Sequence, residues 1–162
     1  YTGSYETLVR RLGQFVSPLE QRAAIEVFFT MLALSCALEN GDAHLKNFAV
    51  LYENPQSKVR LAPAYDLVST TPYVPRDSLA LSLGESRAFP TRSALIRFGR
   101  STCGLTPKTT HRLLGRVSDG VRGAIREMRA YARQARGFHK AAHLLEAAFE
   151  RGLKRSIETA VI

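Results

Sequence analysis

The sequence has little cysteine, and it has no apolar segment long enough to cross a membrane. Its two cysteines, Cys36 and Cys103, lie far apart, in a spacing that matches neither a metal site nor a disulfide framework. Their scarcity favours a reducing, cytoplasmic compartment. The longest apolar stretch, Val27 to Leu38, covers 12 residues, which is too short for a transmembrane helix and predicts a buried one. No secretory signal is visible, so we expect no membrane partner.

Acidic residues are also scarce, and the deficit lies in one half of the chain. The 162 residues carry 23 lysines and arginines against 14 acidic residues, a formal net charge of +9. Residues 1–90 hold 8 basic and 9 acidic side chains, whereas residues 91–162 hold 15 and 5. Arginine accounts for 18 of the basic residues and suits pairing with phosphate or carboxylate groups. A solvated basic face explains the same composition, so charge alone does not establish a nucleic-acid partner.

Capping residues and apolar periodicity predict a mainly α-helical domain. A hydrophobic content of 45% provides for a buried core and excludes a disordered chain. The expected N-caps are Ser4, Ser17, Thr91 and Thr106. The expected helix ends are Gly13, Asn40 with Gly41, and Gly104. We therefore predict helices at 4–13, 18–39, 91–103, 106–137 with a break near 118–120, and 139–159.

A small β-hairpin is predicted between the early and the late helices. Short apolar runs at 48–53 and 58–62 flank a turn that contains Pro55. Four prolines between residues 63 and 90 predict an irregular loop there, with a short strand at 79–83. The predicted fold class is thus mainly α with one small hairpin.

Polar residues cluster between the buried helix and the hairpin, in the sequence NGDAHLKNF at 40–48. Asp66 follows 19 residues after Asn47, in the sequence AYDL at 64–67. Because a hairpin returns the chain to the place where it left, we expect Asp66 to lie beside Asp42 and Asn47.

This constellation has the residue types that phosphoryl transfer to a hydroxyl needs. One carboxylate orients the hydroxyl and accepts its proton, and oxygen ligands hold Mg²⁺ against the phosphates of ATP. Asp42 is predicted to be the base, and Asn47 and Asp66 the metal ligands. The alternative is an ordinary helix end followed by a turn, because an isolated Asp-x-x-x-x-Asn also arises by chance.

Two further residues of the segment have competing interpretations. Lys46 would contact a phosphate, or it is a solvated lysine near a turn. Tyr65 would pack over a nucleotide, or it packs in the core.

The two sequences together resemble the HipA-type serine/threonine protein kinases of bacterial toxin–antitoxin systems. Asp-x-His-x-x-Asn in NGDAHLKNF, followed by Pro-x-Tyr-Asp in LAPAYDLVST at 61–70, is that family's active-site signature. The resemblance implies that Asp42 is the catalytic aspartate and that His44 and Asn47 occupy nucleotide and metal positions. It places Tyr65 and Asp66 on the pair that meets ATP and Mg²⁺.

The resemblance also implies parts that this sequence lacks. HipA-type kinases have a larger N-terminal portion with a phosphate-covering loop and an ATP-binding lysine, and no glycine-rich loop occurs here. Residues 1–162 thus resemble the C-terminal lobe, with a catalytic and metal-binding part at 1–90 and a basic helical part at 91–162. Since the chain begins at Tyr1 rather than Met, we expect a piece of a longer protein. Alone, it is expected to bind nucleotide poorly and to transfer nothing.

Five arginines recur at helical spacing in the basic part. Arg122, Arg126, Arg129, Arg133 and Arg136 share one side of the predicted helix, and apolar residues occupy the adjoining side. The stripe is either a solvated face or a surface that contacts DNA phosphates. HipA-type toxins bind operator DNA together with a helix-turn-helix antitoxin, so the resemblance implies both partners.

Three functions remain open from the sequence. The first is a Mg·ATP-dependent serine/threonine kinase lobe whose substrate, by the resemblance, is an aminoacyl-tRNA synthetase or a translation factor. The second is a non-catalytic module that binds an antitoxin and DNA phosphates. The third is the lobe of a lipid or small-molecule kinase.

Overall fold

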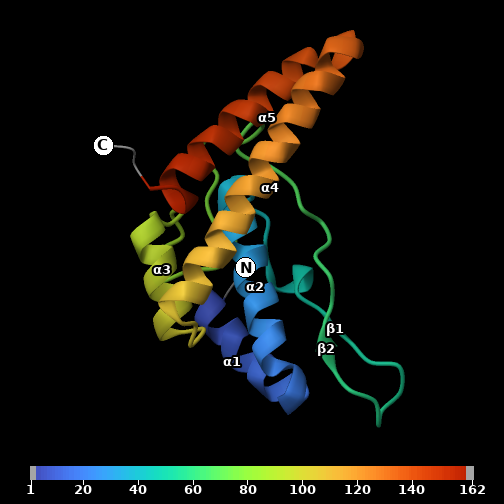
Figure 1. The fold of residues 1–162 in the computed structure, drawn as a ribbon, viewed down its shortest axis with the longest axis vertical. Helices are drawn as coiled ribbons and strands as arrows, with labels where there is room; N and C mark the ends of the chain where they lie inside the picture. Colours follow the sequence, from blue (N-terminus) through green and yellow to red (C-terminus); the bar gives the residue numbers. More distant parts are fainter. Residues whose placement is uncertain (1–2, 160–162) are drawn as a thin grey trace.

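The computed structural model describes residues 3–159 as a helical body from which one helical hairpin projects (Figure 1). The body contains α1 (Tyr5–Phe15), the 3₁₀ turn η1 (Pro18–Glu20), α2 (Gln21–Ala37) and α3 (Arg92–Ser101). The projecting hairpin pairs α4 (Pro107–Gln134) with α5 (His139–Gly152) through the 3₁₀ turn η3 (Arg136–Phe138). The π-helical turn η4 (Leu153–Ile157) ends the described helices. The predicted fold class, mainly α with a small hairpin, is confirmed.

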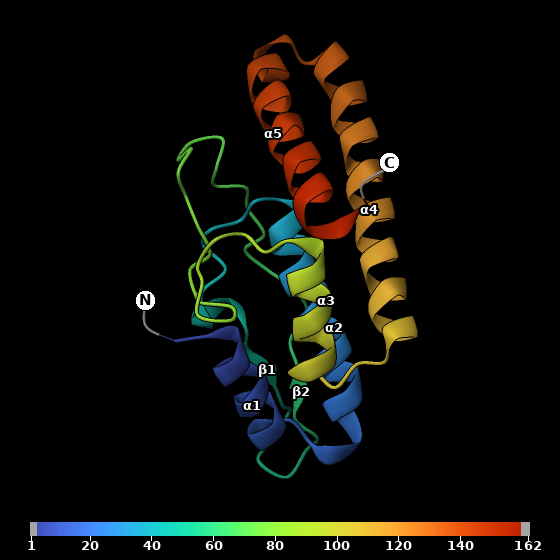
Figure 2. The same ribbon diagram turned by 90° about the vertical axis from the view of Figure 1, so that its left-hand side faces the viewer.

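Helix α2 occupies the centre of the body, between α1, α3 and α4 (Figure 2). Its aromatic and aliphatic residues Phe28, Phe29 and Leu32 have no solvent exposure. The amphipathic helix α4 packs against α2 through residues spaced three and four apart, from Leu113 to Ile125. Core residues come from both 1–90 and 91–162, so the two parts share one hydrophobic core.

The predicted hairpin is present and short. Strand β1 (Val50–Leu51) pairs with β2 (Arg60–Leu61) in antiparallel register, with Val50 opposite Leu61. The Ala62 amide donates to the Ala49 carbonyl at 2.8 Å. Pairing at this end of the hairpin brings the chain that leaves β2 back to the 3₁₀ turn η2 (Leu45–Asn47) that precedes β1.

Three of the four predicted N-caps act as caps. Ser4, Thr91 and Thr106 each accept a hydrogen bond from the third following backbone amide. Ser17 differs, because its hydroxyl accepts from the Val59 amide at 2.9 Å. It thus holds the returning strand of the hairpin instead of the start of a helix.

Several helix boundaries differ from the predictions. Helix α1 continues past Gly13 to Phe15, and α3 ends at Ser101. Helix α4 has no break near 118–120, because Val117 and Val121 are both buried and hold the exposed Gly120 in the helix. The last α-helix ends at Gly152 and continues as the π-helical turn.

The loop at 63–90 is irregular, as predicted, but it contains no strand at 79–83. Leu79 and Leu81 are buried in the core, and the segment forms only isolated bridges, such as that of Ser82 with Ser4. Within the described part of the chain, no helix combines the length and the apolar character needed to cross a bilayer.

Candidate functional site

The site begins where α2 ends, and a left-handed residue sets the direction of the chain there. The sequence predicted that the helix ends at Asn40 and Gly41, and the residue with the left-handed backbone is Glu39, with φ of 51°. The Asn40 amide then donates to the Ser35 carbonyl at 2.8 Å, and the Asn40 side chain accepts from the Asp42 amide at 2.9 Å. Asn40 is 1% exposed. The buried amide side chain thus fixes the backbone from which Asp42 projects.

Asp42 presents its carboxylate to solvent beside an almost buried histidine. The side chain of Asp42 is 53% exposed, and its Oδ1 lies 3.9 Å from Nε2 of His44. The His44 side chain is 12% exposed. A carboxylate in this setting is accessible to a hydroxyl group brought up from solvent, as a general base must be.

Asn47 connects this loop to the segment that follows the hairpin. Its Oδ1 accepts from the His44 amide at 2.9 Å, and its Nδ2 donates to Oδ2 of Asp66 at 2.8 Å. Asn47 is 5% exposed, while Asp66 is exposed. The structure therefore brings Asp66 beside Asn47 across 19 residues of sequence, which confirms the part of the hairpin prediction that concerns Asn47.

Asp66 adopts a left-handed backbone conformation, with φ of 55°. For a residue other than glycine this conformation costs roughly 1 kcal/mol, and such residues cluster at functional sites. The hydrogen bond from Asn47 helps to hold it.

The side chain of Tyr65 contacts the backbone of Lys46. The Tyr65 hydroxyl donates to the Lys46 carbonyl, and the Tyr65 ring is 43% exposed. The Lys46 side chain is exposed. Tyr65 is thus not a core residue, and the proposed nucleotide contacts of both residues stay predictions.

Helix α1 and the irregular loop support the same turn from two sides. Tyr5 is fully buried and donates its hydroxyl to the Ala43 carbonyl at 2.9 Å. Burial raises the pKa of Tyr5, so this hydroxyl stays protonated and remains a donor. On the other side Gly41 lies against Asp77, and a Cβ atom there would come 2.1 Å from Oδ2 of Asp77. The Gly41 position requires glycine for this close approach.

A buried carboxylate at this turn was not predicted from the sequence. Glu39 is 2% exposed, and it accepts hydrogen bonds from Thr71 at 2.6 Å and from Arg151 and Arg155 at 2.7 Å each. Burial on its own would raise the pKa of Glu39, but these hydrogen bonds and the two positive charges lower it overall. A glutamate at the C-terminal end of a buried helix opposes the helix dipole, and that conflict is the signal that could have predicted cationic partners.

The oxygen donors at the site fit Mg²⁺. Asp66 offers a carboxylate, and the Oδ1 atom of Asn47 keeps a second lone pair after accepting from His44. Mg²⁺ takes one or two such protein ligands and completes its coordination with phosphates and water. Within residues 3–159, no group of three or more His, Cys, Asp or Glu side chains comes together in a way that could hold a metal ion.

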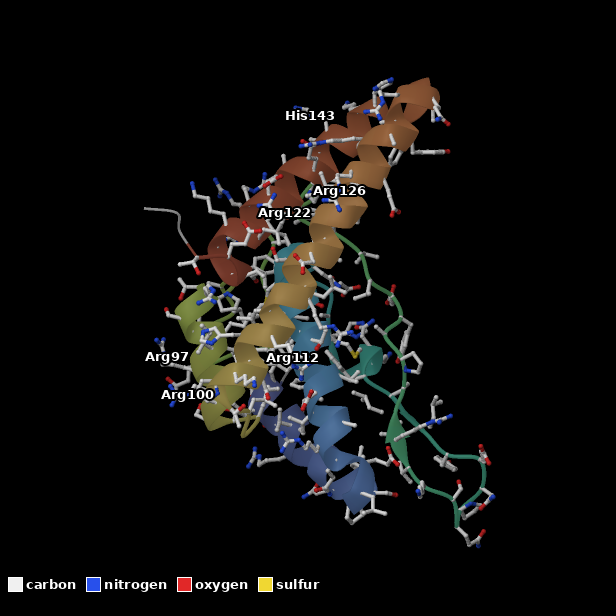
Figure 3. All side chains as sticks on the ribbon, in the orientation of Figure 1. Arg97, Arg100, Arg112, Arg122, Arg126 and His143 are labelled. Atoms are coloured by element: carbon white, nitrogen blue, oxygen red, sulfur yellow. The ribbon has the colours of Figure 1, made fainter. Side chains whose placement is uncertain are left out.

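Two of the five arginines in the stripe form ion pairs with carboxylates. Arg122 forms a two-pronged pair with Glu158 at 2.7 Å, and Arg129 does so with Glu146 at 2.6–3.0 Å. The hydrogen bonds from these arginines lower the pKa of both glutamates. Arg122 and Arg126 follow one another along α4 (Figure 3).

The other three arginines of the stripe show no such ion pair or are not described. Arg126 and Arg133 are exposed and, among the described side chains, form no ion pair. The side chain of Arg136 lies outside the described part of the structure. The contact of this stripe with DNA stays a prediction.

The fold is a helical lobe with one small hairpin, and comparison with known families identifies it. The model of the family described as HipA-like C-terminal domain matches residues 1–125. The chain belongs to this family.

The chain matches parts of two longer proteins. A Sinorhizobium fredii protein named "Putative kinase Y4dM" is 36% identical over 86 residues, which are 52% of this chain and 20% of that protein. A HipA chain from Shewanella oneidensis, solved with HipB and operator DNA, superposes with a TM-score of 0.70 at 23% identity. The match covers 91% of this chain and 35% of the HipA chain, and at this identity it shows the fold alone.

Proposed function

We propose that this chain is the C-terminal lobe of a HipA-like serine/threonine protein kinase that transfers the γ-phosphoryl group of Mg·ATP to a protein hydroxyl. The observation that carries the proposal is the 2.8 Å hydrogen bond from Asn47 to Asp66. This bond brings together residues from the two halves of the sequence signature, and Asp42 presents an exposed carboxylate on the same loop as Asn47. Membership of the HipA-like family supports the same function.

Each site residue has a defined task in this mechanism. Asp42 accepts the proton of the attacking hydroxyl while the hydroxyl oxygen bonds to the γ-phosphorus. The bond from that phosphorus to the bridging oxygen breaks, and ADP leaves with the electron pair. Asn47 and Asp66 would hold Mg²⁺, which neutralises charge on the phosphates. His44 and Asn47 brace the loop through the bond between the His44 amide and the Asn47 side chain.

The remaining parts of the proposal concern partners. The chain spans a fifth of the curated relative and about a third of the solved HipA chain, so the grip on ATP is proposed to involve an N-terminal lobe. By likeness to the HipA, HipB and operator DNA complex, we propose a helix-turn-helix antitoxin and operator DNA as partners. The proposed substrate is an aminoacyl-tRNA synthetase or a translation factor.

The test is an Asp42→Asn variant of the protein expressed from the complete reading frame. Loss of the base should reduce phosphoryl transfer from ATP by about 10²- to 10⁴-fold and leave the circular dichroism spectrum unchanged, because Asp42 is exposed. Asp119→Asn is the matched control, since Asp119 is an exposed aspartate on α4.

Transfer at the unaltered rate in Asp42→Asn would show that the base is assigned wrongly. Transfer to lipids or small alcohols, with none to protein, would favour the lipid or small-molecule kinase instead. Binding of antitoxin without any transfer by the unaltered protein would favour the non-catalytic module.

A further inference from the structure

The carboxylate of Glu39 joins three segments that are far apart in the sequence. Its Oε2 atom accepts from Thr71 and Arg151, and its Oε1 atom accepts from Arg155. Glutamate is almost never fully buried without such partners. We call Glu39, Thr71, Arg151 and Arg155 the Glu39 cluster. The cluster ties the end of α2 to the irregular loop and to the C-terminal helical segment.

The backbone around the Glu39 cluster leads directly to both catalytic loops. The Glu39 carbonyl accepts from the Thr70 amide at 3.2 Å, and the Gly41 amide donates to the Thr70 hydroxyl at 2.8 Å. Glu39 lies three residues before Asp42, and Thr70 lies four residues after Asp66. A displacement of Glu39 would therefore shift the Asp42 loop relative to the Asp66 segment.

The two arginines of the cluster project from a well-anchored element. Arg151 lies at the end of α5 and Arg155 in the π-helical turn η4. Gly152, which lies between the two arginines, packs directly against the Ala37 carbonyl. Ser156, which follows Arg155, donates its hydroxyl to the Pro90 carbonyl at 2.6 Å. These contacts fix the guanidinium groups relative to the end of α2. Both arginines lie beyond the residues that match the family model.

We propose that Arg151 and Arg155, acting through Glu39, are positioning residues that hold the Asp42 loop and the Asp66 segment in their reactive arrangement. The catalytic consequence rests on the proposed kinase function, whereas the structural consequence does not. The competing explanation is a buried ion pair that stabilises the whole fold without favouring these loops. The two explanations differ in where the protein loosens when the pair is broken.

The experiment compares Arg151→Gln and Arg155→Gln with the unaltered protein from the complete reading frame. Arg151 is half-exposed, so its replacement should permit folding even if that of Arg155 does not. Lys154→Gln is one control, because Lys154 is an exposed cation between the two arginines. Glu146→Gln is the other, because it breaks the ion pair of Arg129 elsewhere on the same hairpin.

Amide hydrogen exchange is the first measurement and requires no activity. In both arginine variants, amides at 40–47 and 66–71 should exchange about tenfold faster, while amides of α1 and α3 keep their rates. The two controls should leave the 40–47 and 66–71 amides unchanged. Uniformly faster exchange across the protein, or no change at these loops, would overturn the proposal.

Steady-state kinetics is the second measurement. A displaced base lowers kcat, so we expect kcat to fall about tenfold with the KM for ATP changed less than about twofold. Arg155→Lys, which keeps the charge, should recover part of the loss. An unchanged kcat with loosened loops would overturn the positioning role. If the unaltered protein transfers no phosphoryl group, the proposed function fails, and hydrogen exchange alone then decides whether the arginines hold the loops.

Discussion

Gly152 offers a sharp test of the packing between the C-terminal helix and α2. A methyl carbon built at this position would lie 2.3 Å from the Ala37 carbonyl oxygen and 2.7 Å from that of Cys36. Van der Waals contact requires about 3.5 Å, so the two helix ends would have to separate by roughly 1 Å. Both clashing atoms belong to the backbone, and no side-chain rotation can relieve the contact. Gly152→Ala must therefore move the helix that carries Arg151 and Arg155.

The size of the effect is the balance of one stabilising and two destabilising contributions. Alanine in a helix is better than glycine by about 1 kcal/mol. Overpacking costs about 1–3 kcal/mol, and loss of a partner from a buried ion pair costs about 3–5 kcal/mol. Because movement of the helix weakens the contacts of Glu39 as well, we expect Gly152→Ala to lower the free energy of unfolding by about 2 kcal/mol or more.

Urea denaturation followed by circular dichroism measures this change, with Gly120→Ala as the matched control. Gly120 lies in the interior of α4 with nothing within 4 Å of a built Cβ atom. The same substitution there should raise the free energy of unfolding by about 0.5–1 kcal/mol. Equal stability of the two variants would refute the reasoning about the contact at Gly152.

Two further predictions concern charge. The pKa of Glu39 is lower in the folded protein than its ordinary value of 4.5. The ionised carboxylate therefore stabilises the fold at pH values above 4.5, and this stabilisation is lost as the pH falls through the lower pKa of the folded state. Urea titrations from neutral to acid pH should thus show a smaller acid-induced loss of stability in Glu39→Gln than in the unaltered chain, and identical losses would contradict the assignment. For DNA, replacing Arg126 and Arg133 by glutamine should reduce the slope of log affinity against log salt by about 1.8, or about 0.9 per lost phosphate contact. Filter binding at several salt concentrations measures it, and an unchanged slope would remove this stripe from the DNA interface.

Local sequence signals predicted the helices well because the signals themselves are local. Ser4, Thr91 and Thr106 cap helices through amides only three residues away. The predicted break near Gly120 was wrong because burial of Val117 and Val121 outweighs a glycine within the helix. A weak intrinsic preference of about 1 kcal/mol is readily overridden by packing of two apolar side chains.

In the site as well, contacts between residues close in sequence could be predicted, and contacts between distant residues could not. The neighbourhood of Asn47 and Asp66 could be predicted because a short hairpin separates them. The left-handed conformations of Glu39 and Asp66 could not, because glutamate rarely adopts φ near 50° and aspartate adopts it only as an isolated residue whose position its type does not specify. The partners of Glu39 were also missed, because Arg151 and Arg155 lie more than 100 residues further along the chain.

Ion pairs between the two halves of the chain explain part of the uneven distribution of charge between residues 1–90 and residues 91–162. Arginines of the basic half pair with carboxylates of the near-neutral half: Arg112 with Glu26 at 2.7 Å, and Arg151 and Arg155 with Glu39. Part of the positive excess thus contributes to holding the two halves together. The pairs of Glu39 have the larger effect, because its carboxylate is 2% exposed and would stay buried without a partner, whereas an exposed ion pair contributes only about 0–1 kcal/mol. Arg126 and Arg133 have no such partners among the described side chains, so replacing these two arginines tests contact with an external anion without breaking a described ion pair.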